Sequence, residues 1–197
     1  MTTYSNMADN ELVHYFCAGQ NEAFDELLLR YKDRLYSYIS FYTKNDDMAD
    51  DLFQETFVKA IITLRQGRYQ ETGKFYAWLT RIAHNLLIDQ FRVEQSELLV
   101  YEDEKENSWQ GLTNLTINNH ENEMANEQIL RDVQRLMEHL PADQREVVFM
   151  RIYQDLSFKE ISDITGVSIN TALGRMRYGI INMRKMAERH HIALTVE

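Results

Sequence analysis

The scarcity of turn-forming residues constrains the fold of this 197-residue chain more than any other feature of its sequence. Pro141 is its single proline, and it contains only seven glycines. Hairpins and β-sandwiches need such residues at short, regular intervals, so a protein of many strands is disfavoured. With 44% hydrophobic residues the chain is long enough for one or two small cores. An all-α fold is therefore predicted.

Apolar residues recur at intervals of three and four along the first half of the chain, which is the spacing of helices with one buried face. We expect a short helix that ends at Gly19 and a longer one over residues 21–44. Asn45 can cap a third helix, and a fourth covers residues 75–93. These helices would form the first domain, over residues 1–95.

Helical periodicity is lost between residues 94 and 120, where acidic, Asn, Ser and Gly residues mix. Residues 94–127 hold nine acidic residues and one basic residue, which accounts for most of the net charge of -10. We predict an extended acidic linker over 96–122 and a second helical domain over 123–192. In this second domain Pro141 fits the first turn of a helix.

Residues 159–177 combine a short helix, a turn containing Gly166 and a second helix, the pattern of a helix-turn-helix. Ser157 and Glu160 form a capping box for the first helix, and Ser168 can cap the second. The second helix would expose its N-terminal half to a DNA major groove. Its outward residues would be Ser168, Asn170, Thr171, Gly174, Arg175 and Arg177. The alternative is a packing unit whose arginines only offset the helix dipole.

Two further helix faces are candidate binding surfaces. Asp51, Gln54 and Glu55 share one face with exposed Val58 and Ile62, which suits a basic partner, although solvated charged faces are common. Cations, an amide and an aromatic residue in and just before the fourth helix suit the capture of single-stranded DNA. They are Arg68, Tyr69, Lys74, Arg81, Asn85 and Arg92, with Asp89 placed to orient an arginine, and Phe75 and Trp78 expected in the core.

Several classes of protein are disfavoured. No histidine or ordered loop completes a metal site around the acidic residues 46–51, so neither metal nor cofactor is expected. A helical hydrolase lacks a base arrangement and a phosphate-binding glycine loop. The lone Cys17, the absence of a signal pattern and the absence of an apolar run of about 18 residues predict a cytoplasmic protein without membrane insertion.

Taken in order, these motifs resemble the extracytoplasmic-function (ECF) group of the sigma-70 family of bacterial transcription initiation factors. Residues 50–61 look like its core-polymerase-binding helix, 75–92 like its downstream-promoter helix and 140–177 like its C-terminal domain. The resemblance implies two helical domains, a sigma region 2 bundle and a sigma region 4 with the helix-turn-helix, joined by the acidic linker. It also implies that the linker threads toward the active-site and RNA-exit channels of the polymerase.

The resemblance implies a role for each group of residues. Asp51, Gln54 and Glu55 would contact the β′ clamp helices of core RNA polymerase. The minus-10 promoter element would be bound by Arg68, Tyr69, Lys74, Arg81, Asn85 and Arg92. The minus-35 element would be bound by Lys159, Ser168, Asn170, Thr171, Arg175 and Arg177.

The implied function is that of a sigma factor, not an enzyme. It would bind core RNA polymerase through the β′ and β subunits, recognise and melt promoter DNA, and be held in check by an anti-sigma factor. The alternative is a helix-turn-helix regulator that acts without core polymerase. Two departures from the family stand out. Many members carry lysine and serine where this chain has Leu173 and Gly174, and a basic residue where it has His84, whose contact would be at most pH-sensitive.

Overall fold

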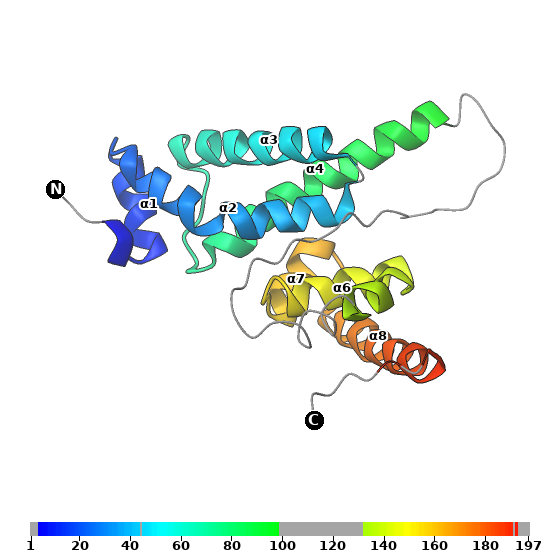
Figure 1. The fold of residues 1–197 in the computed structure, drawn as a ribbon. Coiled ribbons are helices and arrows are strands. Elements are labelled where there is room, and N and C mark those ends of the chain that lie inside the picture. The colour runs from blue at the N-terminus through cyan, green and yellow to red at the C-terminus, as the bar shows by residue number, and fades with distance from the viewer. Residues whose placement is uncertain (1–3, 44, 99–131, 191, 193–197) are drawn as a thin grey trace. The chain divides into compact units, whose positions relative to one another are not determined.

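The computed structural model describes residues 4–43, 45–98, 132–190 and 192. The chain divides into two compact units, Met1–Leu115 and Thr116–Glu197. Every regular element among the described residues is a helix, which confirms the all-α prediction (Figure 1). Beyond residue 98 the predicted linker lies outside the described residues, as does the predicted boundary at residue 123, so both domain limits stay predictions.

The described part of the first unit contains a short 3-10 helix followed by four α-helices. They are η1 (Tyr4–Asn6), α1 (Asp9–Cys17), α2 (Glu22–Tyr42), α3 (Asp46–Arg65) and α4 (Phe75–Leu98). The Asn45 side chain accepts a hydrogen bond from the Asp47 amide at 2.9 Å, which confirms the predicted cap. α4 continues past Val93 because the next residues, EQSEL, contain no glycine or proline and are mostly good helix formers.

α2 supplies the centre of the first core. Leu27, Leu35, Tyr38 and Ile39 are fully buried on it, and it packs against α1, α3 and α4. These residues follow the predicted spacing of three and four, which places them along one stripe of the helix. α3 and α4, the two helices with candidate binding residues, also pack directly against each other. The core therefore fixes both candidate surfaces to one scaffold.

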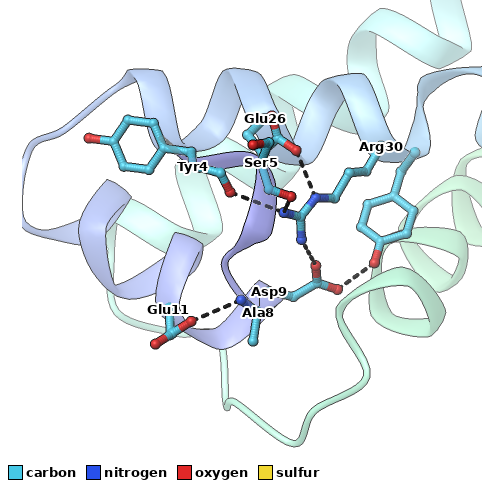
Figure 2. A network of polar contacts seen from close by, with 8 residues as sticks. Tyr4, Ser5, Ala8, Asp9, Glu11, Glu26 and Arg30 are labelled. Carbon is cyan, nitrogen blue, oxygen red and sulfur yellow. Dashed lines mark hydrogen bonds and ion pairs between the residues drawn. The ribbon is translucent and has the colours of Figure 1, made fainter. Parts of the chain in front are cut away.

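Arg30 fastens the N-terminal segment to α2 (Figure 2). Its guanidinium pairs with Asp9 of α1 at 3.0 Å and with Glu26 of α2 at 2.9 Å. It also donates to the backbone carbonyls of Tyr4 and Ser5 at 3.2 and 3.1 Å. Because one planar fork satisfies acceptors from three elements, η1 and α1 are held in one position on α2.

Tyr31 extends this network to the start of α4. Its hydroxyl donates to the Asp9 carboxylate, and its ring stacks on Tyr76 with centroids 5.1 Å apart. Burial, together with the hydrogen bond to Asp9, raises the pKa of Tyr31 above its ordinary value. The phenol therefore stays neutral and keeps donating. The N-terminal segment thus braces the end of α4 that follows the 66–74 loop.

The second unit contains α6 (Ala142–Ile152), α7 (Phe158–Thr165) and α8 (Ile169–Arg189), and residues 132–138 are also helical. Pro141 stands at the N-cap of α6, just before the predicted first turn. The Ser157–Glu160 capping box is present, with the Ser157 amide 2.8 Å from the Glu160 carboxylate. Gly166 ends α7 at φ 72°, and the Ser168 hydroxyl accepts from the Thr171 amide at 3.0 Å. The predicted helix-turn-helix is therefore formed.

The crossing of α6 and α8 depends on Gly179. This residue is buried, and a Cβ added to it would lie 2.7 Å from Val148 Cγ2. We expect Gly179→Ala to destabilise the second unit by about 1–2 kcal/mol, since overpacking outweighs the gain in helix propensity. Urea unfolding of the full chain measures this. Unchanged or increased stability would show that α6 moves aside at no cost.

Candidate polymerase and DNA interfaces

The acidic face of α3 is exposed and lies opposite its buried stripe. Asp51, Gln54 and Glu55 are all exposed, and Val58 and Ile62 beside them are 53% and 45% exposed. The opposite side of the helix is buried and consists of Ala49, Leu52, Thr56, Phe57, Ala60 and Leu64. Glu55 pairs with Lys59 at 3.1 Å, but both side chains are half exposed, so the pair contributes little stability. Charge and apolar surface are both available to a partner.

An open surface pocket of about 360 Å³ lies between α3 and α4. It is lined by Lys59, Ile62, Thr63, Arg68, Ile82, Asn85, Leu86 and Asp89. Apolar side chains from both helices meet an amide, a carboxylate and two cations at this open surface.

Two of the predicted minus-10 residues, Arg68 and Asn85, line this pocket, and the other four do not. Lys74, Arg81 and Arg92 are exposed. Asp89 pairs with Arg92 at 3.5 Å, as its spacing predicts, and both side chains are largely exposed. Tyr69 is half-buried, because its ring lies against Trp78 with centroids 4.5 Å apart. It therefore extends the aromatic core more than it offers a free stacking surface.

The prediction that Phe75 and Trp78 belong to the core is confirmed for Phe75, which is buried, while Trp78 is half-buried. Their rings lie 5.5 Å apart and hold the start of α4 under the 66–74 loop. Burial also raises the pKa of Tyr69 above its ordinary value, with help from Glu71. The loop is thus anchored by its aromatic residue, and its cations stay in solvent.

His84 is not a surface contact, contrary to the expectation from its position in the sequence. It is buried in the first unit, and its Nδ1 lies 3.0 Å from the hydroxyl of Tyr38 on α2. Burial lowers the pKa of His84 to about 4, so the imidazole is neutral at pH 7. The neighbouring Asn85, one position further round the helix, is exposed. His84 joins α4 to α2 and cannot reach a ligand.

The outward face of α8 carries most of the predicted minus-35 residues. Ser168, Asn170, Thr171 and Arg177 are exposed there, and Lys159 is exposed on α7. The hydroxyls of Ser168 and Thr171 lie 2.8 Å apart at the start of the helix. Ser168, Asn170 and Thr171 thus place exposed polar groups at the N-terminal end of α8, where a helix dipole favours anions, and Arg177 lies two turns further along.

Arg175 lies differently from the other predicted minus-35 residues. Its guanidinium bonds the Asp143 carboxylate of α6 at 2.7 Å and is mostly covered. Burial raises the pKa of nearby Glu146 to about 7, and the positive charge of Arg175 opposes that increase. In this structure Arg175 therefore ties α8 to α6 instead of extending freely from the outward face.

Sequence reasoning missed two features of these surfaces. The α3–α4 pocket combines residues from helices that are distant in sequence, and Ile62, Ile82 and Leu86 carry no signal beyond apolar spacing. Asp143 was missed as the partner of Arg175 because the two residues lie 32 positions apart. Within the described residues, His, Cys, Asp and Glu form no group of three or more that could hold a metal ion. No helix in the described ranges is long and apolar enough to cross a membrane.

The fold is that of a helical protein of two units, the second with a helix-turn-helix, and comparison with known proteins specifies its family. Residues 27–97 match Sigma-70 region 2, and residues 130–172 match Sigma-70 region 4. The ECF RNA polymerase sigma-E factors of Salmonella typhimurium and Escherichia coli are each 33% identical over 174 residues. Those alignments cover 86% of this chain and 89% of the relatives. The chain belongs to the ECF group of sigma-70 family sigma factors.

Solved structures support the same fold. The sigma factor RpoE of Bartonella quintana, in complex with the anti-sigma factor NepR, matches with a TM-score of 0.65 and 22% identity. That match covers 84% of this chain and 96% of the other. CnrH, in complex with the cytosolic domain of CnrY, matches with a TM-score of 0.64 and 21% identity, over 93% and 99% of the two chains. At this identity the likeness concerns the fold alone.

Proposed function

We propose that this ECF sigma factor acts by placing two separate DNA-binding surfaces on core RNA polymerase, one on each unit. The observation that carries the proposal is the coincidence of the two family regions with two exposed surfaces. One is the α3–α4 pocket with the polar face of α4, inside the region 2 match, and the other is the outward face of α8, whose first residues lie inside the region 4 match. A helix-turn-helix regulator with an unrelated sensor domain would not need the first of these surfaces.

Asp51, Gln54 and Glu55 would bind the basic clamp helices of the β′ subunit, with Val58 and Ile62 providing apolar contact area. Charge complementarity would steer the encounter, and desolvation of the apolar residues would slow dissociation. The loop cations and α4 lie on the same scaffold, so polymerase binding would place the pocket close to the DNA. Contacts with the β subunit would come from the second unit.

In the minus-10 element, strands would open because unpaired bases are captured as they separate. One base would enter the α3–α4 pocket and hydrogen-bond with Asn85, while Arg68, Lys74, Arg81 and Arg92 neutralise phosphates. Tyr69 would act mainly by holding the loop. At the minus-35 element, Lys159, Ser168, Asn170, Thr171 and Arg177 would contact the duplex, and Arg175 would fix the angle of the helix that carries them.

The protein would supply binding energy and leave the chemistry to the polymerase, which makes it a non-enzymatic initiation factor. It would work in the cytoplasm, where promoter DNA and polymerase meet. An anti-sigma factor would inhibit it by covering surfaces that the polymerase needs. Both solved relatives described above are held in complexes, one of them with a named anti-sigma factor.

Fluorescence anisotropy on promoter duplexes tests this proposal. The free chain, with a net charge of -10, should bind weakly, and addition of core polymerase should raise affinity by about 100-fold or more. Affinity increases because core polymerase would hold the two DNA-binding surfaces so that both can bind one DNA molecule at the same time. Tight, specific binding by the free chain, unchanged by polymerase, would instead support a regulator that acts alone.

A further inference from the structure

The outward face of α8 contains an exposed apolar strip as well as exposed polar residues. Ile169 and Leu173 are 43% and 44% exposed, and they lie four residues apart on one side of the helix. No acidic residue occurs between Ile169 and Ala187, whereas Arg177, Arg184 and Lys185 are exposed. The charged side chains of α8 are therefore all basic over this stretch, with Asp143 of α6 paired to Arg175, and a basic helix surface favours a negatively charged partner such as DNA.

Gly174 adjoins Leu173, and tight packing against the described residues does not require a glycine there. A Cβ added to it would meet no atom within 4 Å among the described residues, in contrast to Gly179 on the same helix. Glycine inside a helix is nevertheless unfavourable relative to alanine. What Gly174 does provide is a low point on the helix surface, where a partner can approach the backbone closely.

Few arginines on this face of α8 are available to contact base edges. Arg175 is engaged by Asp143 at 2.7 Å, so Arg177 is the one exposed arginine between Ile169 and Gly179. The remaining large exposed side chains in that stretch are Ile169, Leu173 and Tyr178. Of the groups that base edges present in the major groove, the C5-methyl of thymine is the apolar one.

We propose that Leu173 is a specificity-determining residue that reads a thymine methyl group in the minus-35 duplex, and that Gly174 allows the helix to come close enough. The inference rests on the proposed function, in which α8 enters the major groove. Leu173 would make an apolar contact at the position where many family members carry a lysine. The chain would accordingly select thymine where a lysine would select guanine.

A methyl-deletion experiment tests the inference. Holoenzyme made from the full chain and core polymerase selects duplexes from a library randomised over the minus-35 element, and each thymine of the selected duplex is then replaced by uracil. For the wild type, one replacement should lower affinity about fourfold, as expected for losing one buried methyl group. For Leu173→Ala the same replacement should have no measurable effect. Ile152→Ala, which truncates an exposed apolar residue on α6, should keep the fourfold response.

Gly174→Ala provides an independent readout. It should raise the melting temperature of the second unit and weaken duplex binding by the holoenzyme, because the added methyl clashes only with DNA. Loss of stability would overturn the inference, as would a uracil effect of equal size in wild type and Leu173→Ala. Unchanged duplex binding by Leu173→Ala would also overturn it and would assign the strip to a protein partner. Failure of the wild-type holoenzyme to select any duplex would contradict the proposed function itself.

Discussion

Reversing the charges of Asp51 and Glu55 together, as Asp51→Lys with Glu55→Lys, is expected to lower the affinity for core polymerase at least about 100-fold. Like charges placed together at an interface cost several kcal/mol, and in the proposed interface two attractive contacts would become repulsive. Both side chains are exposed, so the fold should be unaffected. Glu55 pairs with Lys59 at 3.1 Å, but both side chains are half exposed, so a partner can displace that contact at little cost.

Competition against labelled wild-type chain for core polymerase measures this loss. The matched control is Asp25→Lys with Asp33→Lys, which changes net charge equally at two exposed positions of α2. The control should bind within a few-fold of wild type. An equal loss in both variants would mean that overall charge, not the acidic face of α3, governs binding.

Lowering the pH from 7 to 4 is expected to cost the first unit about 3 kcal/mol of unfolding free energy through His84 alone. In the unfolded chain the imidazole takes up a proton near pH 6.5, whereas burial keeps its pKa at about 4 in the fold. Between these values the unfolded state binds more protons, so stability falls as pH falls. The contribution is complete above pH 6.5 and lost by about pH 4.

Urea unfolding at several pH values, compared between wild type and His84→Asn, isolates this effect. Asparagine can still pair with the Tyr38 hydroxyl but does not titrate. The variant should be less stable at pH 7 and should show a flatter pH dependence below pH 6.5. Parallel pH curves for the two proteins would contradict the account of a neutral, buried histidine.

The helices and their ends were predictable because they depend on local chemistry. The caps at Asn45, Ser157 and Ser168 each satisfy amides within three residues, and Gly166 takes the left-handed conformation that ends α7. α4 ran past its predicted end because a change in composition after Val93 is not a helix-stop signal. Local rules therefore locate the starts of helices better than this particular end.

The details of the binding surfaces were less predictable because they depend on contacts between helices. Nothing local to His84 indicates that it points inward toward Tyr38, and nothing local to Arg175 indicates Asp143. The exposed face of Asp51, Gln54 and Glu55 did follow from spacing, since the complementary stripe of α3 is apolar. Periodicity identifies which side of a helix faces solvent. Tertiary packing decides which polar side chains contact other helices and which stay exposed.

Promoter-dependent run-off transcription with purified core polymerase tests the central claim most directly. Addition of the wild-type chain should produce a transcript of defined length from a promoter that core polymerase alone does not use, and the Asp51→Lys with Glu55→Lys variant should produce none. If the wild-type chain binds that promoter but yields no transcript with core polymerase, the account of a sigma factor that directs initiation is contradicted.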